Sequence, residues 1–503
     1  FRDDIHVIGM PVTEICNNAY TDSRERQLLK NIIYIGALTQ LLEIDPAEIE
    51  KLFGEQYKGK EKLFDANVQA LNLGRDYAQQ HLKRIALKVE RRDAVGDKVF
   101  VDGNSAAALG CVYGGATVCA WYPITPSSSV AEAFIRYTQK LRVDPATGQH
   151  RYAIVQAEDE LASIGIVVGA GWNGARSFTA TSGPGISLMT EFIGLAYFAE
   201  IPAVVINVQR GGPSTGMPTR TQQADVLACA YASHGDTRHV LLFPEDPYEC
   251  FEMSAQALDL AERLQTPIFV MSDLDIGMNQ RLCRPFAWDE SREYDRGKVM
   301  TREALDAGTD FGRYLDVDGD GIPYRTYPGT HPTKGGYFTR GSTKNAYAGY
   351  SEAGADYVYN MQRLLRKFET AKSLVPLPVL TAAKFPARFA AIFYGSTSPA
   401  MHEAIDALAE QGIYINALRI RAFPFQNEIA DFIAAHSKVF VLEQNLDGQL
   451  TTLLINEAGV NPASLIRVLH YDGTPITARF ITQEIAERVS RINVRPLREG
   501  MVA

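Results

Sequence analysis

Apolar and polar positions alternate along the chain in blocks that predict strands followed by helices. From Asn104 onward, β-rich apolar stretches are separated by amphipathic ones, as in "YAIVQA" (152–157) followed by "EDELASIGIVVGAGW" (158–172). The other predicted strands of this region are 117–123, 175–181, 202–209, 239–244 and 267–272. Six strands with intervening helices predict an α/β fold with a doubly wound parallel sheet.

The pattern changes on both sides of this region, and we therefore predict four segments. Residues 1–92 contain a long amphipathic run and are typical of the helical remainder of an α/β unit. Residues 93–280 hold the parallel sheet. Residues 281–375 are rich in Tyr, Gly and charge, which indicates an excursion over a surface or a neighbouring subunit. Residues 376–503 return to strand and helix patterns and predict a smaller α/β domain of three layers.

Composition narrows the class of protein. The chain has 503 residues, too many for one ordinary core, and 46% of them are hydrophobic. No window approaches the roughly 18 apolar residues of a membrane span. The net charge of −9 argues against nucleic acid as a main partner. Six scattered cysteines without a C-x-x-C pair predict no metal or cluster on this chain, and reduced thiols in a cytoplasmic protein.

The sequence starts at Phe1 without an initiator Met or a signal-like segment. We expect residues to be missing upstream of it.

The polar motifs of the 93–280 region follow four successive predicted strands. They are "YPITPSS" (122–128), "AEDE" (157–160), "TSGPG" (181–185) and "QRGGPSTGMPTRT" (209–221). Ligands of open α/β sheets bind outside the carboxyl ends of the strands. The four motifs therefore predict one shared site at that edge of the sheet.

Each motif also has a structural explanation that the sequence leaves open. Pro123 and Pro126 restrict Thr125, whose hydroxyl is available either to cap the next helix or to meet a ligand. The acids of "AEDE" suit a helix N-terminus, and "SGPG" suits a tight turn. The glycine-rich stretch beside Arg210 favours recognition of a carboxylate or phosphate.

The sequence contains two stretches that partly match known binding motifs, and it lacks several catalytic motifs. Gly169-Ala-Gly171-Trp-Asn-Gly174 matches the dinucleotide pattern G-x-G-x-x-G, but a strand follows almost at once, so helix termination and close packing explain it better. "DVDGDG", with Asp316, Asp318 and Asp320, begins like a calcium loop, but Tyr327 stands where the bidentate Glu belongs. A turn is favoured over an ion site. There is no G-x-S-x-G elbow, Walker loop or H-E-x-x-H motif.

Taken together, "YPITPSS", "EDELASIG", "FTATSGPG" and "QRGGPSTGMPTRTQQADV" resemble the α subunit of 2-oxoacid:ferredoxin oxidoreductases. The stretches "DGDGIPYRTYPGTHP" and "YGSTSPAMHEA" are similar to the long form of that subunit, which is related to 2-oxoglutarate enzymes. The resemblance covers about 104–450. Residues 1–92 look like the γ domain fused in front of the long form, without its opening glycine-rich turn.

The resemblance implies a thiamine diphosphate site shared by two subunits. The 93–280 segment would be the pyrimidine-binding domain and 376–503 a transketolase C-terminal-like domain. The β subunit would hold the diphosphate, Mg²⁺ and a [4Fe-4S] cluster in an (αβ)2 heterotetramer.

The resemblance also assigns roles to residues. Glu160 would bind the aminopyrimidine, with Thr125 and Arg210 as the other catalytic residues. Cofactor-binding positions would include Pro123, Ile124, Ser182, Gly183 and Gly185, and substrate-binding ones Thr125, Arg210, Gly211 and Gly212.

The implied reaction converts 2-oxoglutarate, coenzyme A and oxidised ferredoxin to succinyl-CoA, CO2 and reduced ferredoxin. It is reversible, and its reverse would serve a reductive tricarboxylic acid cycle. An enzyme for pyruvate or a branched 2-oxoacid is the near alternative. A thiamine-dependent transferase or decarboxylase without electron transfer, a non-catalytic scaffold subunit and a simple dehydrogenase are the others.

Overall fold

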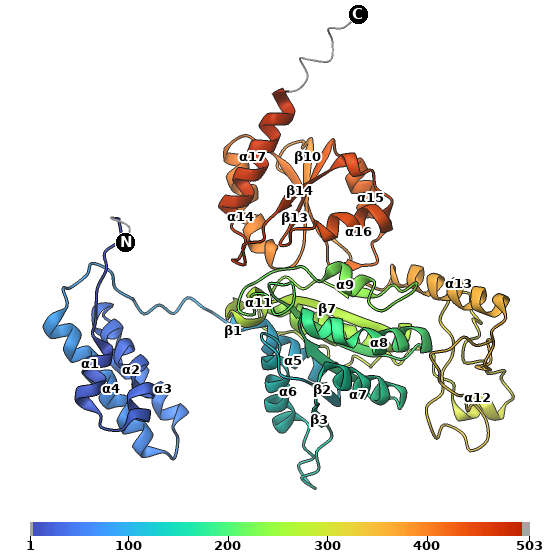
Figure 1. Ribbon diagram of the computed structural model, residues 1–503, viewed down its shortest axis with the longest axis horizontal. Helices are drawn as coiled ribbons and strands as arrows, with labels where there is room; N and C mark the ends of the chain where they lie inside the picture. Colours follow the sequence, from blue (N-terminus) through green and yellow to red (C-terminus); the bar gives the residue numbers. More distant parts are fainter. Residues whose placement is uncertain (1–3, 495–503) are drawn as a thin grey trace, which may run out of the picture. The chain divides into compact units, whose positions relative to one another are not determined.

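The computed structural model describes residues 4–494 in two compact units, 1–96 and 97–503 (Figure 1). The ends of the first and last predicted segments, 1–3 and 495–503, lie outside the described residues. No helix within 4–494 is long and apolar enough to cross a membrane. All six cysteines are buried and unbridged.

The first unit is helical. Its elements are α1 (Val12–Ala19), α2 (Ser23–Leu41), α3 (Pro46–Gln56) and α4 (Glu61–His81). The Asp22 carboxylate accepts hydrogen bonds from two backbone N–H groups and so caps α2. Helices α2 and α4 meet at Gly36 and Gly74, where an added Cβ would lie about 2 Å from a backbone oxygen of the facing helix. Within residues 4–96 the structure has helices and no strand, which agrees with the helical remainder of an α/β unit that the sequence predicts there.

The second unit contains the predicted parallel sheet, and all six predicted strands are confirmed. Its order is β12-β6-β7-β5-β4-β2-β3, and only β12 is antiparallel to its neighbour. The strands are β2 (Val118–Trp121), β3 (Ala153–Gln156), β4 (Ser177–Thr181), β5 (Ala203–Gln209), β6 (Val240–Leu242), β7 (Pro267–Asp273) and β12 (Ala422–Phe423).

Helices cover both faces of this sheet. They are α5 (Gly103–Tyr113), α6 (Ser128–Leu141), α7 (Glu160–Trp172), α8 (Gly183–Ala199), α9 (Val226–Ala230), α10 (Pro247–Leu264) and α11 (Leu274–Met278). Helices α5, α6 and α10 pack together, and α7 packs with α8. Right-handed crossovers in opposite directions place these two groups on opposite faces. A two-stranded sheet, β1 (Val99–Val101) and β8 (Arg281–Cys283), lies beside them.

The glycines of the dinucleotide-like motif lie where the sequence predicts. Gly169 and Gly171 belong to the last turn of α7, and Gly174 follows it with a positive φ. A Cβ on Gly171 would lie 2.2 Å from the backbone oxygen of Pro202. Close packing and helix termination therefore account for the motif.

The 281–375 segment returns to the sheet domain of its own chain. It contains α12 (Arg302–Asp306) and α13 (Gly354–Ala371), neither of which was predicted. From α13, Arg363 and Lys367 pair with Glu200, which is fully buried at the end of α8. The Arg313 guanidinium donates to the Glu200 backbone oxygen at 2.7 Å. Whether this segment also contacts a partner stays a prediction.

The aspartates of the calcium-like stretch pair with nearby basic side chains. Lys298 Nζ lies 2.7 Å from Asp318 Oδ2 and 2.8 Å from Asp320 Oδ1, and Arg366 pairs with Asp316 at 2.5 Å. Among residues 4–494 no cluster of His, Cys, Asp or Glu is arranged to hold a metal ion. These pairs support the turn interpretation.

The last segment forms a second sheet in the order β14-β13-β10-β11-β9, parallel except for β9. Its strands are β9 (Val379–Thr381), β10 (Phe389–Phe393), β11 (Ile415–Arg419), β13 (Lys438–Glu443) and β14 (Leu465–Leu469). Its helices are α14 (Ser398–Glu410), α15 (Asn427–Ala434), α16 (Gln449–Ala458) and α17 (Ala478–Val494), with 3-10 turns η1 (Gly395–Thr397) and η2 (Pro462–Ser464). Strand β12 joins the two sheets by pairing with β6.

Candidate active site

The four polar motifs lie at adjacent strand ends. In the sheet order β5-β4-β2-β3, Arg210 follows β5, Ser182 follows β4, Thr125 follows β2 and Glu160 follows β3 by a few residues. Because these strands are parallel, the four residues share one edge of the sheet.

Thr125 is not the cap of helix α6. The helix begins at Ser128 with Ser127 as its N-cap residue, and the hydroxyls of both serines face the Ile124 carbonyl. Thr125 is exposed, and no described residue forms a hydrogen bond with its hydroxyl. Its backbone oxygen accepts a bond of 2.6 Å from Arg210 Nη1. The structure therefore leaves the Thr125 hydroxyl available to a ligand.

Glu160 is a buried carboxylate at the first residue of α7. The cap is its neighbour Asp159, which accepts a bond of 2.6 Å from the Ala162 N–H. Glu160 is 6% exposed, and no residue within 4–494 donates a hydrogen bond to its carboxylate. A Cβ on Gly185 would lie 2.8 Å from Glu160 Cγ and 2.0 Å from Thr181 Oγ1. The Glu160 side chain thus passes directly beside the first turn of α8.

That first turn of α8 contributes a second polar group without a partner. Ser182 is the N-cap residue of α8, and its hydroxyl is buried with no hydrogen-bond partner in the described chain. At Gly183, an added Cβ would lie 2.8 Å from Asp225 Oδ1. Because Gly183 has no side chain, the Asp225 carboxylate can lie close to the start of α8.

Arg210 is a buried guanidinium without a carboxylate partner. It is 8% exposed, donates to the Thr125 and Thr215 backbone oxygens at 2.6 and 3.3 Å, and has an unpaired Nε. Burial lowers its pKa, against the opposing charges of Asp225 and Glu160. A guanidinium held by backbone oxygens is suited to bind an anion.

The loop after Arg210 closes on itself. The Gly211 carbonyl accepts a bond of 2.7 Å from the Met217 N–H, and the Gly212 N–H donates to Gln222 Oε1 at 3.1 Å. Both glycines line the same cavity as Arg210.

This cavity has a volume of about 700 Å³ and lies between the first turn of α8, the 210–225 loop and the second sheet. Of the predicted residues, Gly183, Arg210, Gly211 and Gly212 line it, whereas Pro123, Ile124, Thr125, Glu160, Ser182 and Gly185 do not. Thr125 adjoins it through its bond to Arg210.

Sequence reasoning missed part of this cavity. Asp225 stands within the quoted motif "QQADV", and an acid so close to a glycine-rich loop was a signal that we did not use. Leu446, Asp447, Gln449 and Tyr471 complete the wall from the second sheet. They lie more than 200 residues away in the chain, and no local pattern identifies them.

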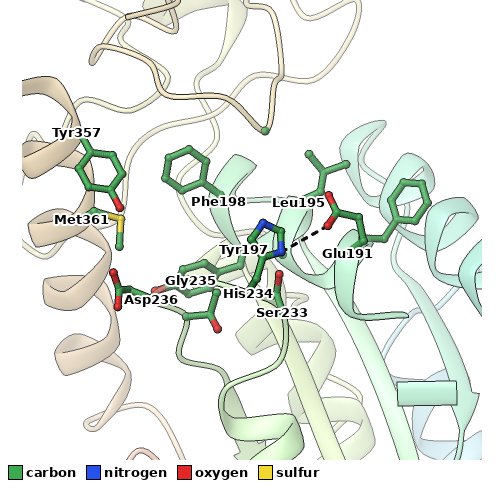
Figure 2. A pocket seen from close by; sticks show the side chains of 14 residues that line it. Glu191, Leu195, Tyr197, Phe198, Ser233, His234, Gly235, Asp236, Tyr357 and Met361 are labelled. Atoms are coloured by element: carbon green, nitrogen blue, oxygen red, sulfur yellow. Dashed lines mark ion pairs between the residues drawn. The ribbon is translucent and has the colours of Figure 1, made fainter. Parts of the chain in front are cut away.

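A second cavity, of about 400 Å³, lies along the other half of α8 (Figure 2). Its wall combines Leu195, Phe198 and Tyr357 with the 233–237 loop, and His234 Nδ1 lies 3.6 Å from Glu191 Oε2. None of the predicted site residues lines it. The candidate site is therefore the cavity at the sheet edge.

Comparison with known proteins bears on the family to which the chain belongs. Residues 109–309 match the family described as pyruvate flavodoxin/ferredoxin oxidoreductase, thiamine diP-bdg, and residues 2–77 match pyruvate ferredoxin/flavodoxin oxidoreductase. The α subunit of 2-oxoacid:ferredoxin oxidoreductase 2 from Aeropyrum pernix is 32% identical over 97% of this chain and 76% of its own length. The chain belongs to this family, as an α subunit. It carries the thiamine diphosphate-binding domain, and the resemblance seen in its motifs is confirmed.

Two further relatives have names that mention 2-oxoglutarate. The 2-oxoglutarate synthase subunit KorA of Methanocaldococcus jannaschii is 33% identical over 70% of this chain and 89% of its own length. A solved structure of 2-oxoglutarate:ferredoxin oxidoreductase from Magnetococcus marinus, with 2-oxoglutarate, coenzyme A and succinyl-CoA bound, is 28% identical with a TM-score of 0.79. The match covers 95% of this chain and 80% of that one.

Proposed function

We propose that this α subunit belongs to an enzyme that converts 2-oxoglutarate, coenzyme A and oxidised ferredoxin to succinyl-CoA, CO2 and reduced ferredoxin, reversibly. The observation that carries the proposal is the presence at one sheet edge of two buried charges: the carboxylate of Glu160, to which no described residue donates a hydrogen bond, and the guanidinium of Arg210, which no described carboxylate pairs with. The names of the M. jannaschii and M. marinus relatives, which both contain 2-oxoglutarate, support this choice of 2-oxoacid.

The residues at the edge fit the pyrimidine end of thiamine diphosphate. A buried carboxylate and the buried Ser182 hydroxyl, both without partners in the described chain, match a ring that carries nitrogen donors and acceptors. When bound, the cofactor supplies the carbanion that attacks the keto carbon of the substrate. Glu160 would hold a proton at a nitrogen of the aminopyrimidine ring, and Pro123, Ile124, Gly183 and Gly185 would line the ring.

The 2-oxoacid would bind beside this ring. Arg210 would bind the carboxylate next to the keto group, because its Nη atoms are fixed by backbone oxygens and its charge has no ion pair in the described chain. The Thr125 hydroxyl would contact the carboxylate or keto oxygen, and Gly211 and Gly212 would bring the backbone close to the substrate.

We further propose the wider assembly that the resemblance implies. A β subunit would supply the diphosphate site, Mg²⁺ and a [4Fe-4S] cluster in a cytoplasmic (αβ)2 heterotetramer. In this chain, 1–92 would be a γ domain and 376–503 a transketolase C-terminal-like domain.

The test is a substrate panel with the complex purified from its natural source. We expect 2-oxoglutarate to give the highest kcat/KM, with succinyl-CoA as product and an absorption spectrum of an iron–sulfur protein. A preference for pyruvate or a branched 2-oxoacid would refute the substrate assignment. An iron-free complex that turns over without ferredoxin would refute electron transfer.

A further inference from the structure

Asp225 is a second carboxylate of the candidate site and has no role in the proposal above. It lines the 700 Å³ cavity together with Arg210 and lies between the end of β5 and the first turn of α8. Its Oδ2 accepts one hydrogen bond, of 3.0 Å, from Asn207 Nδ2, and its N–H donates to Gln209 Oε1 at 3.1 Å. No described residue donates to Oδ1.

Compared with Cys229, Tyr394 and Arg210, Asp225 has the pKa nearest to neutral pH. Burial raises its pKa to about 6, although the Asn207 bond and the Arg210 charge oppose the shift. On α9, burial raises the pKa of the Cys229 thiol well above the ordinary value of a thiol. Burial also raises the pKa of the Tyr394 hydroxyl, which follows β10 of the second sheet, well above the ordinary value of a tyrosine. Arg210 stays charged, and the residues that α8 contributes to the cavity wall, Gly183, Pro184 and Ser187, have no titratable side chain.

The proposed reaction, on which this inference rests, releases one proton. A 2-oxoacid anion, the thiol form of coenzyme A and two oxidised ferredoxins give an acyl-CoA, CO2, two reduced ferredoxins and H⁺. The two electrons leave on ferredoxin, and the proton comes from the thiol, whose S–H bond breaks as the C–S bond forms. A base in the cavity must accept it, because the thiolate is the nucleophile and a thiol ordinarily has a pKa near 8.5.

We infer that Asp225 accepts the thiol proton of coenzyme A during acyl transfer and releases it to water in the cavity. In the reverse direction the protonated carboxyl returns the proton to the leaving sulfur. Three features suit Asp225 to this role: no described residue donates to its Oδ1, it lies on the cavity wall, and the charge of the nearby Arg210 favours its anionic form.

The test separates acyl transfer from decarboxylation, using whichever 2-oxoacid the wild-type complex prefers. We expect Asp225→Asn to lower CoA-dependent turnover about 10²-fold, the usual effect of removing a general base. The release of labelled CO2 in a single turnover without coenzyme A should change less than twofold. Asp236→Asn, which removes an acid from the second cavity, is the matched control.

A pH profile and a spectroscopic titration complete the test. Wild-type acyl transfer should fall tenfold per pH unit below about pH 6, and an infrared band of a protonated carboxyl should appear over the same range. Asn207→Ala removes the one hydrogen bond that a described residue donates to the carboxylate, so both transitions should move to higher pH.

The inference is overturned if Asp225→Asn keeps the wild-type pH profile, or if it loses CO2 release and acyl transfer equally. If Asp225→Asn does not assemble, unmoved transitions in Asn207→Ala overturn it instead. A preference for pyruvate in the substrate panel would refute the 2-oxoglutarate assignment and leave this test intact.

Discussion

Replacing Gly185 by alanine tests how closely Glu160 is positioned by the first turn of α8. The new Cβ would lie 2.0 Å from Thr181 Oγ1 and 2.8 Å from Glu160 Cγ, whereas ordinary contact begins at 3.4 Å. Thr181 is fully buried and Glu160 nearly so. Both side chains must therefore shift, Thr181 by more than an ångström and Glu160 by about half of one, because a packed interior has no free space.

The expected cost has two parts. Overpacking of this kind destabilises a protein by about 1–3 kcal/mol. A catalytic group misplaced by about 1 Å loses about 10²-fold in rate, so a smaller shift of Glu160 should lower kcat about 10- to 100-fold. The assay compares turnover at saturating thiamine diphosphate with the midpoint of thermal unfolding of the same complex.

Two variants make this prediction specific. Gly169→Ala lies on α7, the helix that carries Glu160, and has no atom within 4 Å of the new Cβ. It should keep full activity and gain about 0.5–1 kcal/mol from helix propensity. Thr181→Ala combined with Gly185→Ala removes the closest contact and should restore part of kcat. A Gly185→Ala complex with full activity and unchanged unfolding would refute the reasoning.

Three other outcomes follow from the same structure. Arg210→Lys cannot reproduce both hydrogen bonds to the Thr125 and Thr215 backbone oxygens, so KM for the 2-oxoacid should rise about 10- to 100-fold in steady-state assays. An unchanged KM would contradict the proposed role of Arg210 in substrate binding. Glu200→Gln leaves Arg363 and Lys367 buried without their carboxylate and should cost about 3–5 kcal/mol in denaturant unfolding, and a loss below 1 kcal/mol would contradict this. The raised pKa of Asp225 means that the folded chain binds the Asp225 proton more tightly than the unfolded chain does. The free energy of unfolding of the wild type should therefore fall as pH rises from about 4 to about 6. Asp225→Asn should be more stable than the wild type by about 2–3 kcal/mol at pH 8 but not at pH 4.

The central sheet could be predicted from sequence because strands β4 to β7 are buried along their whole length and read as apolar runs between helices. The site edge followed from the same pattern, since parallel strands bring the residues after their carboxyl ends together. The pattern identified Arg210 as a candidate at this edge, and the resemblance to the family then singled out Glu160 within the "AEDE" motif.

The features that sequence missed depend on contacts between distant segments. Helix α13 buries Asn360, Arg363 and Lys367 among apolar residues on the face that packs inward, so an apolar stripe alone does not mark that face. The charges of Arg363 and Lys367 are tolerated because Glu200, more than 150 residues earlier in the chain, pairs with them. Burial alone would raise the pKa of Glu200, but the two positive charges hold it well below its usual range. The cavity wall from the second sheet depends in the same way on how two domains pack.

The most direct test of the central claim, that Glu160 and Arg210 form a thiamine-dependent 2-oxoacid site, is CO2 release from 2-oxoglutarate by the Glu160→Gln complex. Glu158→Gln is the matched control, because Glu158 is exposed two residues away. The account predicts that Glu160→Gln assembles normally but releases CO2 at least about 10²-fold more slowly, while Glu158→Gln matches the wild type. Wild-type CO2 release by Glu160→Gln would contradict it.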